Sequence, residues 1–252
     1  MEDQNPVVET TAEVSAVSGI FQVFSSPGSF FSSLKNKQAW LIPFVLTLIV
    51  AAVLGHFTRP LIIKDLAPQI RANLEKYKAQ MPSERFNAAM ADIDKMEQEA
   101  EENAFQIKYI LIAAIFIVIG YFFIAFIGWL SGNFMFGGKA NFWLIMNVVA
   151  FASLIGLSGD IIRGVMMLAK DSSAVYTGLG MLKPVNDGSF VYYLFRQIDL
   201  FSIWRIIVTA IGLGALYKMT SRNFAIILFV LWLIFAALVA GANIFTGGSI
   251  MY

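Results

Sequence analysis

Long apolar stretches alternate with short polar ones along most of this chain. A bilayer core of about 30 Å is crossed by about 20 helical residues, and five stretches have about that length and few charged side chains. They predict an all-α integral membrane protein with five transmembrane helices within residues 39–252. The predicted spans are 39–57, 109–131, 140–159 (or to 168 if the helix continues), 199–217 and 223–246.

A different pattern precedes the first span. In residues 20–38 apolar side chains recur at helical spacing while Ser, Asn and Lys occupy the opposite side, which predicts an amphipathic helix at the membrane surface. The alternative is a helix docked on the rest of the protein. Ser26 followed by Pro27 suits a helix start. Residues 1–19 are acidic and polar and predict a disordered tail.

The charges are concentrated between the first two spans. Residues 58–108 hold eight Lys/Arg and nine Asp/Glu, which is 17 of the 35 in the chain. Apolar residues recur there at helical spacing on both sides of Pro82, so residues 64–105 predict a helical hairpin outside the bilayer whose second arm runs into the second span. Its charges are interpreted as a solvated face. Residues 170–199 contain an Asn-Asp-Gly turn and are also placed at the surface.

Two further residue sets follow from this layout. Aromatic side chains collect at the headgroup level, and the predicted interfacial anchors are Phe24, Phe31, Trp40, Tyr192, Tyr193 and Trp204. Small residues four apart let membrane helices approach closely, and the predicted packing positions are Ala210 and Gly214 and, in the last span, Ala236, Ala237, Ala240 and Gly241.

Composition supports the membrane assignment and removes several functions. Hydrophobic residues make up 58% of the chain and charged residues 14%, against about half and about a quarter in soluble proteins. A net charge of +1 without a basic stripe argues against nucleic-acid binding. The absence of Cys excludes disulfides and thiol chemistry. We find no metal-ligand spacing and no cofactor motif, so no catalytic residue, metal or cofactor is assigned.

The positive charges favour an N-terminus on the inner side of the membrane. On that arrangement the inner side carries five basic residues and the outer short loop four. The inner set is Lys35, Lys37, Lys139, Lys218 and Arg222, and the outer set is Arg163, Lys170, Lys183 and Arg196.

Polar residues at span edges are the candidates for chemistry. The sequence Gly156-Leu-Ser-Gly-Asp160 is similar to the serine motif of rhomboid proteases, but its Ser158 needs a His base, and the one His, His56, lies at the far end of the first span. Gly and Ser also serve helix contacts. The candidate polar cluster is Asp160, Arg163, Asp199, Arg205 and Asn147.

Two interpretations of that cluster stay open. Asp160 and Arg163 could pair within one helix. Arg205 could extend to the headgroups, or it could reach Asp160 or Asp199 across the bundle and close a polar site. Asn147 could join two helices by a hydrogen bond.

The segment RQIDLFSIWRIIVTAIGLGALYKMTSR, residues 196–222, and the opening FSSPGSFFSSLKNKQAWLIPF resemble the Ypt-interacting protein (Yip) domain family, with the second typical of bacterial members. The resemblance covers about residues 20–245, including the five-span layout. It implies a bacterial inner-membrane protein with its N-terminus inside. Eukaryotic relatives act in vesicle traffic with small GTPases, but their Asp-Leu-Tyr-Gly-Pro element is missing here, which puts GTPase binding in doubt.

Three functions follow as hypotheses. The first is a non-enzymatic scaffold that organises membrane components, with membrane lipid, a second copy or other membrane proteins as partners. The second is a transporter, channel or lipid-moving protein that uses the charges at the span edges. The third, remote one is an intramembrane serine protease built on Ser158.

Overall fold

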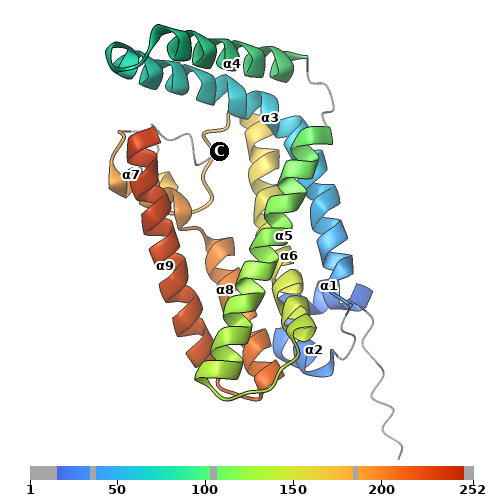
Figure 1. The fold of residues 1–252 in the computed structure, drawn as a ribbon. Helices are drawn as coiled ribbons and strands as arrows, with labels where there is room; N and C mark the ends of the chain where they lie inside the picture. Colours follow the sequence, from blue (N-terminus) through green and yellow to red (C-terminus); the bar gives the residue numbers. More distant parts are fainter. Residues whose placement is uncertain (1–15, 35–37, 103–106, 184–186, 247–252) are drawn as a thin grey trace, which may run out of the picture.

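A computed structural model describes residues 16–34, 38–102, 107–183 and 187–246 (Figure 1). The described chain is helical, and five helices are long and apolar enough to cross a membrane. This confirms the predicted all-α membrane fold. The five helices are α3 (Leu41–Tyr77), α5 (Ile107–Trp129), α6 (Phe142–Lys170), α8 (Leu200–Tyr217) and α9 (Ser221–Thr246).

Helix α6 forms the centre of the bundle. It packs on α3, α5 and α8, while α8 also packs on α9, and most of the α6 side chains between Ile145 and Leu157 are buried. Helices α5 and α9 instead expose many large apolar side chains, such as Phe116 and Phe235. An apolar surface of this extent is unusual for a protein in water, and it fits helices that face lipid.

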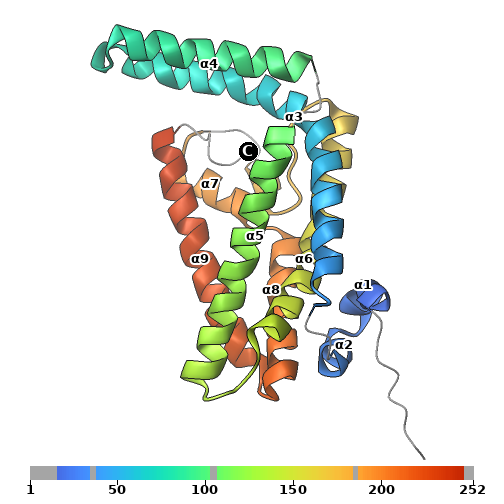
Figure 2. The ribbon, with the colours of Figure 1, turned by 45° about the vertical axis from the view of Figure 1, so that its right-hand side comes forward.

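Two short helices, α1 (Ala16–Ser25) and α2 (Pro27–Ser33), lie at the end of the bundle where α3 begins (Figure 2). Helix α1 starts before residue 20, so the predicted tail at 1–19 extends too far; residues 1–15 lie outside the described residues. Phe30 is buried and meets Phe151 of α6 edge-on at 4.8 Å. Phe21 on α1 is exposed. The segment is therefore docked on the bundle and also keeps an apolar side chain at the surface.

The hairpin differs from the prediction in how it begins. Helix α3 runs through 37 residues, about 55 Å at the standard rise, which is far longer than a bilayer core. Its second half contains Pro60 and Pro68, residues that bend helices, and crosses the end of the bundle (Figures 1 and 2). The first arm is thus a continuation of the first span. The 3₁₀ turn Lys78–Gln80 and α4 (Ser83–Glu101) complete the hairpin.

Connections at the two ends of the bundle are compact. A π-helical turn, Leu130–Met135, ends α5, and the Asn133 amide exchanges two hydrogen bonds with the backbone of Ala140 before α6 starts. On the hairpin side, the 3₁₀ turn Leu179–Leu182 and α7 (Phe190–Gln197) connect α6 to α8. Helix α7 packs on α9.

The predicted anchors divide into two groups. Phe31, Tyr192 and Tyr193 are buried within the protein, so they pack helices together and are not available to the headgroups. The other three are half-buried aromatic contacts. Phe24 meets Trp204 edge-on at 5.6 Å, and Trp40 stacks on Trp143.

The structure buries the predicted packing positions of α8 and one of the two predicted pairs of α9. Ala210 and Gly214 are buried, and Gly214 lies against Ser221 at the start of α9. On α9 the buried positions are Ala236 and Ala240 rather than Ala237 and Gly241. The pair Ala236 and Ala240 therefore forms the packing face of α9, and Ala237 and Gly241 are half-buried beside it.

Candidate functional site

A charged cavity of about 260 Å³ lies at the hairpin end of the bundle, between α6, the loop after it, α7 and α8. Its charged lining residues are Asp160, Arg163, Arg196, Asp199 and Arg205. Four of them belong to the predicted polar cluster. The fifth, Arg196, was predicted only as a charge that bears on orientation.

Two glycines of α6 give the cavity its shape. A Cβ on Gly159 would lie 2.6 Å from Cγ of Phe201, so a larger residue would push α8 away from α6. A Cβ on Gly156 would lie 3.3 Å from Nη1 of Arg205, so the missing side chain leaves space for the guanidinium group. The glycines of the Gly156–Asp160 motif therefore serve close packing and the seat of Arg205.

Asp199 has a structural task at the start of α8. Its Oδ1 accepts hydrogen bonds from the backbone N–H groups of Phe201 and Ser202, at 2.8 and 3.0 Å, as an N-cap residue does. The Ser202 hydroxyl donates to Oδ2 at 2.5 Å. Gly178 pairs with Asp199 through an isolated bridge. Asp199 thus holds the loop and the helix end that form one wall of the cavity.

Asp160 and Arg205 attract each other electrostatically across the cavity without a direct contact. Asp160 is exposed and Arg205 is half-buried, and neither side chain forms a hydrogen bond or ion pair with a described residue. Of the interpretations that the sequence leaves open, direct contacts of Asp160 with Arg163 and of Arg205 with an aspartate are not formed. Opposite charges face the same cavity, and both can receive a ligand.

Arg196 is held at the cavity by aromatic residues. Its Nη1 donates to the Tyr192 hydroxyl at 3.2 Å, and its guanidinium lies 5.1 Å from the ring centre of Tyr176. Sequence reasoning missed this residue because it follows an aromatic run that was placed at the headgroups. The available signal was its position three residues before Asp199, at the same helix junction.

Asn147 lies elsewhere, in the buried part of α6. It is 0% exposed, and its Oδ1 accepts a hydrogen bond from the backbone N–H of Trp40 at 2.7 Å. It therefore joins α6 to the start of α3 and does not line the cavity.

The serine of the rhomboid-like motif is engaged by its own helix. Ser158 Oγ donates to the carbonyl of Ile155 at 2.7 Å, a frequent bond of helical serine. The His56 ring packs against Phe57. Among the residues that the structure describes, no group of His, Asp and Glu could hold a metal ion.

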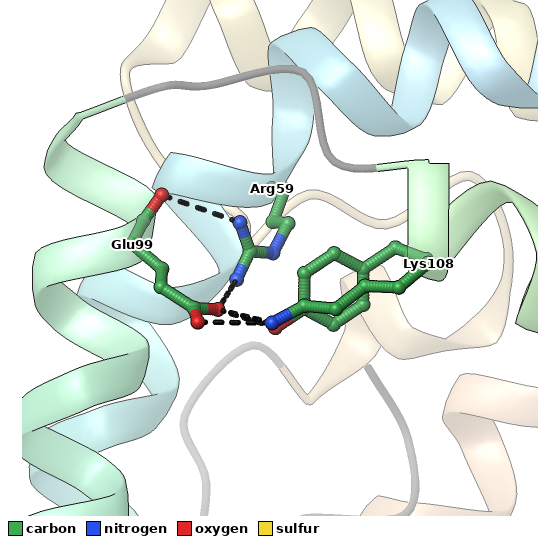
Figure 3. A network of polar contacts seen from close by, with 4 residues as sticks. Arg59, Glu99 and Lys108 are labelled. Carbon is green, nitrogen blue, oxygen red and sulfur yellow. Dashed lines mark hydrogen bonds and ion pairs between the residues drawn. The ribbon is translucent and has the colours of Figure 1, made fainter.

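A second polar cluster clamps the base of the hairpin (Figure 3). Glu99 of α4 accepts hydrogen bonds from Lys108 at 2.9 and 3.1 Å and from the Tyr109 hydroxyl at 2.7 Å. Arg59 of α3 lies 3.5 Å from the Glu99 carboxylate and 4.0 Å over the Tyr109 ring. The hydrogen bonds from Lys108 and then Tyr109 lower the pKa of Glu99 to about 2.

A third set of contacts joins the hairpin to the loop after α6. Asp65 accepts hydrogen bonds from the Ser173 N–H at 2.7 Å, the Ser173 hydroxyl at 2.8 Å and the Ser172 hydroxyl at 3.0 Å. Lys64 pairs with Asp171 at 2.6 Å. Sequence analysis interpreted the hairpin charges as a solvated face and missed both clamps. The usable signal was that two opposite charges, Arg59 and Glu99, lie on either side of the predicted turn.

Comparison with known proteins identifies the family. Membrane protein YknW of Bacillus subtilis (strain 168) is 30% identical over 105 residues, which are 40% of this chain and 45% of that protein. The chain thus spans less than half the length of this relative. No solved structure matches the chain. The Yip1 domain matches residues 21–242, and a match over so much of the sequence shows that the protein belongs to the Yip1 domain family.

Proposed function

We propose that this membrane protein is a non-enzymatic scaffold that gathers other membrane proteins through the α3–α4 hairpin. The observation that carries the proposal is the form of the hairpin: a rigid charged arm held at its base and extending across one end of the bundle (Figure 1). Family membership supports a membrane role, and the arm supplies a surface on which partners can bind.

The rigidity comes from contacts within the arm. Leu66 of α3 and Phe86 and Ile93 of α4 are buried, and the two helices pack on each other. Arg71 pairs with Asp94 at 2.6 Å and also with Glu97. Because α4 packs mainly on α3, the arm keeps its shape without resting on the membrane helices along its length. A preformed surface loses little conformational entropy on binding.

The outer surface of the arm has suitable chemistry for a protein partner. Tyr77 near the turn is exposed, and so are Lys76, Arg85, Asp92 and Lys95. Tyr and Arg are enriched where proteins meet, and charges of both signs give specificity. The partner surface is therefore expected to be polar and of mixed charge.

Site-specific photo-crosslinking in native membranes tests the scaffold. A photoreactive residue at Tyr77 or at Arg85 is expected to give protein adducts of defined mass. The matched control is Phe235, which is exposed on the apolar face of α9 and is expected to react with lipid. If the hairpin positions give no protein adduct while Phe235 reacts with lipid, the scaffold proposal fails.

The predicted orientation forms part of the proposal: a bacterial inner membrane with the N-terminus inside and the hairpin outside. Because the chain has no Cys, single cysteines report sidedness directly. We expect an impermeant thiol reagent on intact cells to label Arg85→Cys and to leave Lys218→Cys unlabelled until the membrane is opened. The reverse labelling pattern would place the hairpin on the inner side and the N-terminus on the outer side of the membrane.

Movement of lipid or solute is a second candidate function, favoured by the charged cavity. Ionisable groups within a membrane protein often mark a pathway. The test is flux and lipid scrambling in liposomes that carry the protein, compared with empty liposomes and with Arg205→Gln. Movement that depends on Arg205 supports this function, and well-inserted protein without movement removes it.

A further inference from the structure

We propose that the charged cavity binds the headgroup of a phospholipid that carries both a phosphate and a primary ammonium group, the phosphatidylethanolamine class. The phosphate lies against the arginines and the ammonium against Asp160. This inference concerns binding and is independent of the scaffold and of lipid movement.

The charges of the cavity suit a ligand with both signs. Three arginines and two aspartates line it. Asp199 already accepts three hydrogen bonds at the start of α8, which leaves Asp160 as the available anion. Arginine binds phosphate oxygens through two parallel N–H groups, and Arg205 lines the cavity near Asp160 without a hydrogen bond from its side chain to a described residue. A carboxylate beside such a phosphate site favours a ligand that also carries an ammonium group.

The depth of the cavity matches the headgroup layer. Asp160 lies 18 residues after Phe142, the first residue of α6, which is about 27 Å along the helix axis. A hydrocarbon core of about 30 Å that begins near Phe142 therefore ends close to Asp160. Arg205 lies in the second turn of α8, whose first turn is on the same side of the membrane. Both charges can meet a lipid phosphate at the interface.

The surroundings of the cavity favour a lipid over a free metabolite. Leu200 is 65% exposed at the start of α8, and Met181 and Leu182 in the neighbouring loop are 64% and 73% exposed. These side chains can contact acyl chains, which a water-soluble ligand lacks. The volume, about 260 Å³, is below the usual range of about 300 to 1,000 Å³ for drug-sized ligands. The cavity therefore has room for a lipid headgroup while the acyl chains stay outside it.

Native mass spectrometry of the protein released from nanodiscs tests the assignment. The nanodiscs contain equal amounts of phosphatidylethanolamine and phosphatidylglycerol, which share the phosphate and differ in the ammonium. Wild type is expected to retain phosphatidylethanolamine preferentially. Asp160→Asn should lose that preference, and Arg205→Gln should reduce retention of both lipids by about tenfold, as loss of a charge-assisted hydrogen bond does.

Two controls make the outcome decisive. Arg222→Gln removes one exposed charge at the start of α9, which lies at the end of the bundle away from the hairpin (Figure 1), and it should leave retention unchanged. Equal losses of lipid retention in Arg222→Gln and Arg205→Gln would show that retention depends only on the overall charge of the protein, which would overturn the proposal. A wild type that retains both lipids equally would overturn it as well. Asp160→Asn decides the question even if Arg205→Gln misfolds, because Asp160 bonds to no described residue.

A competition arm separates the lipid from a free phosphate compound. Delipidated protein in detergent is incubated with millimolar phosphoethanolamine or with inorganic phosphate before lipid is added. Lipid retention that persists in the presence of these soluble compounds supports a site that also contacts the acyl chains. Full displacement by either soluble compound would identify a water-soluble phosphate ligand and overturn the assignment to lipid.

Discussion

Replacing Asn147 by Leu should weaken the attachment of α3 to the bundle centre. Leu is close to Asn in size, so the change removes a hydrogen-bond acceptor without opening a large cavity. The acceptor serves the backbone N–H of Trp40, just before α3 begins at Leu41. Helix starts carry N–H groups that have no partner within the helix, so the variant leaves the Trp40 donor without its acceptor.

The magnitude follows from the burial of Asn147 and the chemistry of the bond. Side-chain hydrogen bonds between membrane helices average about 0.6 kcal/mol and reach about 1.7 kcal/mol. A buried donor that loses its partner costs about 1 to 3 kcal/mol. Asn147 is 0% exposed and the bond is 2.7 Å long, so we place the loss in unfolding free energy at about 1 to 2 kcal/mol.

Reversible unfolding in mixed micelles measures this loss, and hydrogen exchange at the Trp40 amide locates it. Ser158→Ala is the matched control on the same helix, because its hydroxyl bonds only to the carbonyl of Ile155 among the described residues. We expect little change in that control. If Asn147→Leu unfolds like the control and Trp40 exchanges no faster, the hydrogen bond contributes nothing and the reasoning is wrong.

Three further predictions address the cavity, the clamp and the α9 interface. Gly159→Ala should cost about 1 to 3 kcal/mol, seen as a lower melting temperature, because its Cβ would lie 2.6 Å from Phe201. The Glu99 clamp should be fully formed above the ordinary carboxyl pKa of 4.5 and lost as pH falls through the lowered pKa of about 2. Hydrogen exchange of α4 should rise over that pH window, and Glu99→Gln should remove the pH dependence. Ala240→Leu should destabilise by about 1 to 3 kcal/mol, and Ala237→Leu by less than about 0.5 kcal/mol, in thermal unfolding.

Hydropathy predicted the five membrane helices because the bilayer sets both their length and their polarity. It could not predict where α3 ends. The helix passes from an apolar half to a charged half without a break, and it stays helical while its direction and its surroundings change. A hydrophobicity pattern reports the surroundings of a segment, so it indicated a membrane span and a separate hairpin arm where the structure has the single helix α3.

The cavity was partly predictable from chain order. Asp160 lies toward the end of α6 and Asp199 at the start of α8, and consecutive spans place these two ends on the same side of the membrane. The seat of Arg205 could not be derived in the same way. It depends on the missing side chain of Gly156, and a glycine in a membrane helix has the same appearance in sequence whether it faces a helix or an arginine.

The aromatic residues show the limit of composition. Tyr192 and Tyr193 were placed at the headgroups, yet both are buried. A tyrosine suits either setting because its ring is apolar and its hydroxyl needs one partner. Tyr192 finds such partners in Arg196, one turn further along α7, and in Tyr176, which only the fold of the loop between α6 and α7 brings to it.

The arm and the cavity are parts of one structural unit at the same end of the bundle. Asp65, at the base of the arm, bonds to Ser173, and two residues later Val175 begins the stretch of loop that lines the cavity. The same loop reaches Asp199 through Gly178. A shift of the arm therefore acts on the cavity wall over a very short path.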